Sequence, residues 1–167
     1  MKTKRTDITA AAPLVLFALF AVLAASVLLT GASLYRSRTE ADRIAWDRRT
    51  ASQYLSMRIR QSDTAGAFFV GDFDTKTPGG SGDTFFALEM HDGVLYSTRI
   101  YVWEGNLCEL FAPHSADFER GCGEVLTALP DLHFTLAGGR LGAHLRFADG
   151  TEEELFLTMR SSGEALP

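Results

Sequence analysis

The sequence predicts an α+β fold in which a long N-terminal helix packs with its second half on an antiparallel β-sheet. Two observations carry this prediction. No charged residue lies between Asp7 and Arg36, so 28 consecutive positions are uncharged. From Phe85 onwards apolar residues alternate with polar ones between Gly-containing turns, which is typical of an antiparallel meander. A sheet with one apolar face must bury it, and an amphipathic helix is the available cover.

The uncharged stretch, residues 8–35, is long enough to cross a membrane, because a hydrocarbon core of about 30 Å needs about 20 apolar residues. We therefore expect a short cytoplasmic tail over residues 1–7 and a transmembrane helix over residues 8–35. A cleaved signal sequence is one alternative, with small residues at 24–26 and 31–33 for cleavage, although its apolar region is usually about 7–15 residues. A buried core helix is the other alternative.

Charge is distributed unevenly along the chain, whose net charge is −5. Residues 36–60 contain seven arginines against three acidic residues, whereas residues 61–167 contain six basic against 17 acidic residues. The acidic part argues against nucleic-acid binding, which needs a basic surface. The Arg-rich segment suits either anionic lipid headgroups or a solvated helix face. Basic residues flank the apolar stretch on both sides, so charge alone leaves the orientation open.

The segment after the apolar stretch, residues 36–63, is expected to be an amphipathic helix that packs on the sheet as one unit with it. It lacks Gly and Pro, and its apolar residues recur at spacings of three and four. Arg48 interrupts the stripe, and its long stem can lie along apolar surface. The residues expected in the buried stripe are Ala41, Ile44, Ala51 and Leu55, and those expected to point outward are Arg43, Asp47 and Arg60.

Residues 64–167 are expected to form the sheet domain, after a Gly-rich loop region that reaches Gly82. Tight turns are predicted at Asp92-Gly93, Gly138-Gly139 and Asp149-Gly150. The expected strands lie at 85–90, 94–103, 107–111, 132–136, 141–147 and 155–159, with an irregular stretch at 112–123. The apolar residues expected on the two sheet faces are Phe85, Phe86, Tyr96, Ile100 and Tyr101. An apolar second face would be a protein-contact patch.

Several short motifs carry a family resemblance that covers nearly the whole chain. They are Gly31 and Tyr35, then Arg49, Tyr54, Arg58 and Asp63, then Ala65-Gly66, Tyr101, Gly105-x-Leu107-x-Glu109-Leu110, Gly123 and residues 157–161. At these positions the chain resembles a small uncharacterised Gram-positive family of pilin-like membrane proteins, which is similar to type IV pilins and the minor pilins of the competence machinery. The resemblance implies an envelope protein of a pilus-like or secretion assembly. It supplies no catalytic or binding residues.

The sequence departs from pilins at its beginning. A prepilin is usually cut after Gly or Ala just before the apolar run, and the fifth residue after the cut is usually Glu. Here no Gly precedes Gly31 and no Glu precedes Glu40. The prepilin-peptidase signal is therefore absent or degraded.

No arrangement of residues predicts catalysis, a cofactor or a metal site, so we expect a protein that is not an enzyme. The cysteines lack a Cys-x2-Cys partner, and no histidine has a neighbour at metal-ligand spacing. Asp72-Phe73-Asp74 indicates an acidic turn rather than a calcium loop. Gly79–Gly82 lacks the Lys of a phosphate loop, and Glu152–Glu154 indicates a solvated charge run. The histidines are His91, His114, His133 and His144, of which His133 and His144 are expected to face solvent.

These observations favour a single-pass membrane protein whose C-terminal domain is extracytoplasmic and whose partners are the bilayer and other pilin-like subunits. No small-molecule substrate is expected. Ala18, Ala21 and Ala25 give one face of the anchor small side chains, which suits close packing with another membrane helix, although alanine is also common on lipid-facing helices. The alternative is a membrane-tethered extracytoplasmic sensory or ligand-binding domain, for which seven residues leave little room for a cytoplasmic output.

Cys108 and Cys122 are expected to form a disulfide in an exported domain, and two free thiols are the alternative. A bond that closes a loop of 13 intervening residues stabilises the fold by about 3 kcal/mol in the chain-entropy model. Mass spectrometry of the unreduced, alkylated protein should find one bonded pair. Alkylation of both thiols without reduction would show that the bond is absent.

Overall fold

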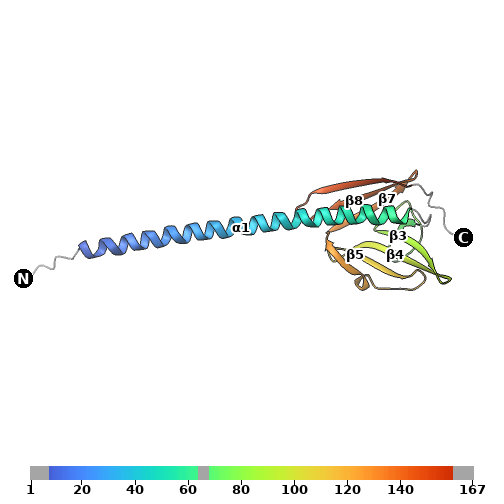
Figure 1. Cartoon of the computed structure of the whole chain (residues 1–167), viewed down its shortest axis with the longest axis horizontal. Coiled ribbons are helices and arrows are strands. Elements are labelled where there is room, and N and C mark those ends of the chain that lie inside the picture. Colours follow the sequence, from blue (N-terminus) through green and yellow to red (C-terminus); the bar gives the residue numbers. More distant parts are fainter. Residues whose placement is uncertain (1–7, 64–67, 160–167) are drawn as a thin grey trace, which may run out of the picture. The chain divides into compact units, whose positions relative to one another are not determined.

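The structure is a computed structural model that describes residues 8–63 and 68–159. The chain divides into two compact units, Met1–Arg43 and Ile44–Pro167. Helix α1 (Ile8–Ser62) contributes to both units, and all the strands belong to the second (Figure 1). The predicted α+β class is confirmed: a long N-terminal helix, apolar in its first half, packs against antiparallel sheets in a pilin-like arrangement.

The apolar half of α1 is exposed along its length. Its large apolar side chains, from Leu14 to Leu34, have exposed fractions of 56% or more. Within the described residues α1 is the one helix long and apolar enough to cross a membrane, a property that membrane anchors and signal sequences share.

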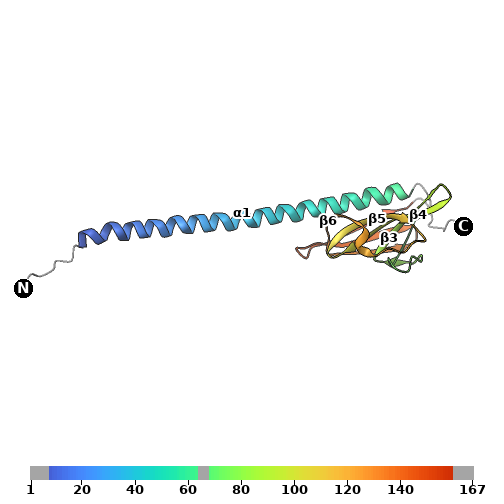
Figure 2. The ribbon, with the colours of Figure 1, turned by 90° about the horizontal axis from the view of Figure 1, so that it is seen from below.

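The strands form two antiparallel sheets rather than the single meander that the sequence predicted. Sheet A has the order β1-β3-β4-β5-β6, and sheet B has the order β2-β7-β8-β9. Figure 2 labels β3, β4, β5 and β6 of sheet A. Sheet A contains β1 (Phe68–Gly71), β3 (Thr84–His91), β4 (Val94–Trp103), β5 (Asn106–Pro113) and β6 (Glu124–Ala128). Sheet B contains β2 (Ser81–Gly82), β7 (Asp131–Ala137), β8 (Arg140–Arg146) and β9 (Glu152–Thr158). A 3₁₀ turn, η1 (Arg120–Cys122), precedes β6.

The six expected strands are present within one or two residues of their predicted bounds at most ends, and the turn at Asp92-Gly93 has the two positive φ angles of a tight hairpin. Three strands were not predicted. β1 is buried at all four positions, so it shows no alternation of apolar and polar residues. β2 has two residues, and β6 is an edge strand with little alternation. The expectation of a loop across residues 64–82 was therefore wrong at β1 and β2.

The two sheets meet where β1 lies beside β2. Val70 forms an isolated antiparallel bridge with Gly79, and the backbone of Gly71 lies against Gly82. A Cβ atom at Gly82 would collide with the Gly71 backbone, so the junction requires glycine at this position. The close approach turns the chain from one sheet into the other and leaves their inner faces on a shared core.

The main core lies between α1 and both sheets. Ala51, Leu55 and Ile59 of α1 are fully buried. They share one cluster with Phe85 and Ile100 of sheet A and with sheet B residues that include Phe134, Leu141 and Leu145. Tyr54 and Leu157 pack against the cluster's edge.

The predicted helix stripe is correct at Ala51 and Leu55 and wrong at its beginning. Ala41 is exposed because it belongs to the first unit, outside the packed domain, and Ile44 is partly buried. Arg43 and Arg60 are exposed as expected. Asp47 was expected to point outward, but it is partly buried and accepts a hydrogen bond of 2.7 Å from the Thr127 hydroxyl.

Replacing Leu55 with Asp should abolish the cooperative thermal melt of the full-length protein. An unpaired carboxylate in this core costs several kcal/mol, against a total stability of about 5–15 kcal/mol. The matched control is Gln53→Asp, which introduces the same charge two residues away at an exposed position. Its free energy of unfolding should stay within about 0.5 kcal/mol of the parent's. A cooperative, stable Leu55→Asp protein would contradict the packing of α1 on the sheets.

Candidate functional site

A polar network joins α1 to the inner face of sheet A. Glu109 of β5 accepts hydrogen bonds from the Tyr54 hydroxyl and from Arg58 Nε, the latter at 2.9 Å. Arg58 Nη2 lies 2.8 Å from Glu109 Oε1 and donates to the Thr98 hydroxyl at 3.3 Å. Burial, followed by the bond to Glu109, raises the pKa of the Tyr54 phenol. The network fixes the rotation of α1 on sheet A, because its donors and acceptor come from different elements.

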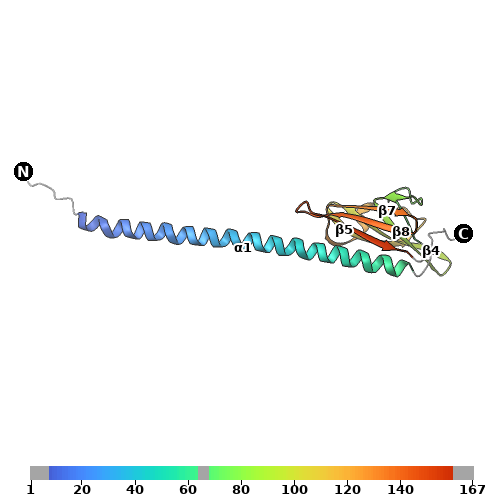
Figure 3. The ribbon, with the colours of Figure 1, turned by 90° about the horizontal axis from the view of Figure 1, so that it is seen from above.

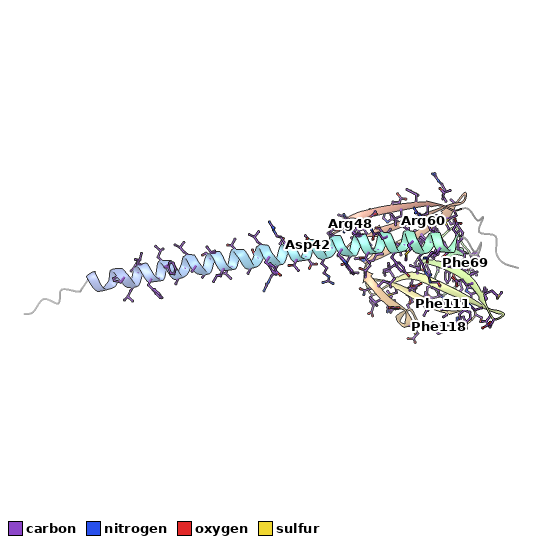
Figure 4. The ribbon with its side chains drawn as sticks, in the orientation of Figure 1. Asp42, Arg48, Arg60, Phe69, Phe111 and Phe118 are labelled. Carbon is purple, nitrogen blue, oxygen red and sulfur yellow. The ribbon has the colours of Figure 1, made fainter. Side chains whose placement is uncertain are left out.

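Arg48 holds the other flank of α1 to sheet B. Its guanidinium lies 5.1 Å from the centre of the Phe147 ring and 3.4 Å from Asp149 Oδ2, and it donates to the Thr151 hydroxyl. Asp149 and Thr151 form the turn between β8 and β9, so one side chain ties this turn to the helix. The predicted role of the Arg48 stem on apolar surface is consistent with this position (Figure 4).

The outer face of sheet A carries a second, smaller core. Phe73 packs there on Tyr101, with ring centres 4.5 Å apart, beside Cys108, Leu110 and Ala112. Phe73 comes from the loop after β1, whereas Tyr101 lies on β4. Both faces of sheet A are therefore apolar, as the sequence predicted, but two loops cover the outer face at this position.

These two loops are joined by ion pairs. Lys76, in the loop after β1, pairs with Asp117 and donates to the Ala116 carbonyl at 3.0 Å. Arg120, in the loop after β5, lies 2.7 Å from Asp83 and 3.5 Å from Asp74. Asp74 thus belongs to an acidic turn that pairs with arginine, in agreement with the interpretation from the sequence.

Arg99 is fully buried beneath the loops and has no carboxylate in hydrogen-bonding contact among the described residues. Its Nη2 donates to the carbonyls of His114 and Ala116 at 3.4 and 3.2 Å. Its guanidinium lies 5.3 to 5.9 Å from the ring centres of Phe73, Phe86 and Phe118. Carbonyl oxygens and ring faces stabilise a cation without neutralising it, and burial lowers the pKa of Arg99 from its ordinary value.

His114 is partly buried beside this cation. Its ring meets those of Phe69 and Phe86 edge-on, and its Nδ1 is buried without a hydrogen-bond partner among the described residues. Burial, and then the charges of Arg99 and Lys76, lower its pKa. The imidazole is therefore kept neutral by its surroundings.

Cys108 and Cys122 are free cysteines in the structure, Cys108 buried and Cys122 exposed. Burial is the main cause that raises the pKa of the nearby Tyr101 phenol to about 12, and the charges of the two cysteines raise it further, Cys108 more than Cys122. The Tyr101 hydroxyl donates to the Arg120 carbonyl at 2.6 Å, which places it beside η1. Burial also raises the pKa of the Cys108 thiol. The predicted disulfide is not formed here and stays a prediction.

The other predicted residues lie apart from these networks. His133 and His144 are exposed, as expected, and face each other across β7 and β8. Glu152 and Glu154 are exposed on β9, whereas Glu153 is partly buried. Among the described residues no three His, Cys, Asp or Glu side chains come together as a metal site. Ala18, Ala21 and Ala25 are exposed on α1, and their role in packing stays a prediction.

The sequence analysis did not predict the networks around Glu109 and Arg99. The available signal was that Tyr54, Arg58 and Glu109 all belong to the motifs of the pilin-like resemblance, although they stand up to 55 residues apart. Arg99 gave no signal, because a lone arginine in a strand ordinarily faces solvent. Both networks position elements, and neither pairs a nucleophile with a base.

Fold and surfaces together define a class: a small α+β domain built on the end of a long N-terminal helix that is apolar in its first half. The chain belongs to the family DUF4860, described as a domain of unknown function, whose model matches residues 46–146. No curated protein matches the chain, and no solved structure matches it.

Replacing Glu109 with Ala should lower the free energy of unfolding by about 1–3 kcal/mol, because Tyr54 and Arg58 would lose their shared acceptor in a partly buried site. The control is Glu124→Ala, which removes the exposed carboxylate opposite Glu109 on β6. It should change stability by less than about 0.5 kcal/mol. Chemical denaturation of both variants measures the difference, and equal stabilities would contradict the role of Glu109.

Stability should fall as the pH is lowered from about 7.5 to about 5.5, and His114 should account for part of the loss. Its folded pKa lies below the ordinary value of about 6.5, so in this range the unfolded chain binds a proton that the folded chain does not. The His114→Gln variant should show a smaller loss over the same range in denaturation curves. Parallel profiles for the two proteins would contradict the assignment.

Proposed function

We propose that this protein is a non-catalytic, single-pass membrane subunit, pilin-like in architecture, that assembles with other such subunits in a pilus-like or secretion assembly of the cell envelope. The observation that carries the proposal is the construction of α1, which is apolar and exposed in its first half and buried against two sheets in its second. The resemblance to minor pilins supports the same reading.

The filled core favours this proposal over the sensory alternative. Leu55 and Ile59 meet Phe85, Phe134 and their neighbours in one cluster of buried side chains, which occupies the space where a ligand would lie between helix and sheets. The titratable groups Tyr54, Arg58 and Glu109 hold α1 in place, and Arg99 holds the loop after β5. We accordingly propose that the domain acts through its surfaces rather than through catalysis.

The proposed orientation places residues 1–7 in the cytoplasm and the sheet domain outside. Full-length protein with a single cysteine at Ser81 or Ser162, in a Cys122→Ser background, should react with a membrane-impermeant maleimide on intact cells. Ser81 is exposed on β2, Ser162 lies outside the described residues, and Cys108 is buried. Protection of both sites until lysis would overturn the orientation, and recovery of a shortened, soluble chain would favour a cleaved signal sequence.

Assembly is tested separately with two full-length copies that carry different tags. After cross-linking in intact cells, each tag should recover the other, whereas a tagged, unrelated single-pass membrane protein should recover neither. Isolation of each copy alone would overturn the assembly proposal.

A further inference from the structure

The face of α1 that points away from the sheets carries a regular stripe of exposed residues. Trp46 and Met57 are 60% and 51% exposed, although both are large and apolar. Each is followed three residues later by an exposed arginine, Arg49 or Arg60. The two pairs are 11 residues apart, which is close to three full helical turns, so they lie on one side of the helix. We call Trp46, Arg49, Gln53, Met57 and Arg60 the outer stripe.

The same pairing of residue types occurs once more, 11 residues earlier in the sequence. Tyr35 precedes Arg38 at the same spacing of three, and both residues are exposed. The buried stripe of Ala51, Leu55 and Ile59 explains how α1 packs on its own domain, but it does not explain this second periodicity.

The composition of the outer stripe is that of a protein–protein contact. Trp, Met and Arg are enriched at such interfaces, and Lys is depleted. The stripe contains no Lys, and Arg49 and Arg60 form no ion pair with any described residue. A partner that suits it needs acidic groups and an exposed apolar side chain along an element of comparable length.

Strand β9 of this chain has these properties. Glu152 and Glu154 are exposed, and Glu154 has no ion-pair partner within the described chain, while Glu152 lies 3.6 Å from the exposed His144. Phe156, the next residue on the same face, is 65% exposed. β9 is also an edge of sheet B, with β8 as its one paired neighbour among the described strands.

The outer stripe and β9 lie beside each other on one molecule. Figure 3 shows β9, in red, alongside the second half of α1. Arg49 and Gln53 of the stripe line one hollow of about 360 Å³ with Glu153, which lies on the partly buried face of β9, opposite to the exposed face that carries Glu152, Glu154 and Phe156. Arg48 Nε and Ser52 Oγ, from two further residues of the hollow, are buried without a hydrogen-bond partner in the described part of the chain.

We propose that the outer stripe of one copy binds β9 of a second copy, and that β9 of the first copy is bound in return. This inference rests on the proposed assembly function and names its contact. A surface on which a basic stripe adjoins an acidic strand is complementary to itself across a two-fold axis, because each patch then meets its opposite. If the two-fold axis runs parallel to α1, the outer stripe of each copy meets β9 of the other. The α1 helices of the two copies then run in the same direction.

A second copy fits the stripe better than a lipid surface does. Residues 61–167 carry 17 acidic against six basic residues, so anionic headgroups would repel this domain while they attracted the arginines. On another copy the arginines meet a local acidic patch, Glu152 and Glu154 of β9, beside the exposed ring of Phe156.

Charge reversal tests the contact in full-length protein in neutral detergent, with sedimentation to measure self-association. One variant combines Arg49→Glu and Arg60→Glu, and the other combines Glu152→Lys and Glu154→Lys. Each alone should associate at least about tenfold more weakly than the parent, because like charges then face each other. An equimolar mixture should recover the parent affinity, since every contact again joins opposite charges. The control, Glu104→Lys with Glu119→Lys, reverses two exposed charges elsewhere and should change nothing.

Each other result overturns the inference. If the parent associates but neither variant is weaker, the copies meet through another surface, and the proposed assembly function stands. If the stripe variant alone is weaker, or the mixture is not restored, β9 is not the partner. If the parent stays monomeric and binds vesicles that contain anionic lipid, the stripe binds lipid. Failure of differently tagged copies to co-purify from cells removes the proposed function itself.

Discussion

The burial of three side chains of α1 between two sheets is the interaction on which the folded domain depends. Ala51, Leu55 and Ile59 are fully buried and join residues of both sheets in one cluster. A buried leucine or isoleucine contributes about 1.5–3 kcal/mol, a large share of the stability of a small domain. Sheets A and B adjoin each other directly where β1 lies beside β2. Without the helix, the parts of both inner faces that these three side chains cover would be open to water.

Polar groups add direction to this apolar contact. Tyr54 and Arg58 reach Glu109 on one flank of the helix, and Arg48 reaches Asp149 and Thr151 on the other. Hydrophobic burial alone is non-directional, whereas hydrogen bonds from both flanks permit one rotation and one register of α1. The outward face of the helix is then fixed as well, and with it the position of Trp46, Arg49, Met57 and Arg60.

The outer loops follow a different physical rule. Arg99 is a buried cation held by carbonyl oxygens and aromatic rings, and His114 is a neutral imidazole beside it. This arrangement ties the loop after β5 to the sheet, and the pairs Lys76–Asp117 and Arg120–Asp74 then tie it to the loop after β1. The outer face of sheet A, which the sequence suggested as a contact patch, is therefore partly closed by the chain's own loops.

Sequence alone determined the features that depend on local pattern. The uncharged run before Arg36, the spacing of Ala51 and Leu55, and the turn at Asp92-Gly93 each follow from neighbouring residues, and the structure contains all three. The fold class follows from them, because an apolar helix face and an apolar sheet face must cover each other.

Only the tertiary structure decided what depends on residues far apart in the chain. The division into two sheets rests on the contact of Gly71 with Gly82. Strand β1 was not predicted, because burial on both of its faces removes the alternation of apolar and polar residues that marks a strand. Asp47 turned inward because Thr127, 80 residues away, offers it a hydroxyl. Likewise, the neighbourhood of Arg49 and Glu153 arises from folding, since no local pattern encodes which distant charge a helix face will meet.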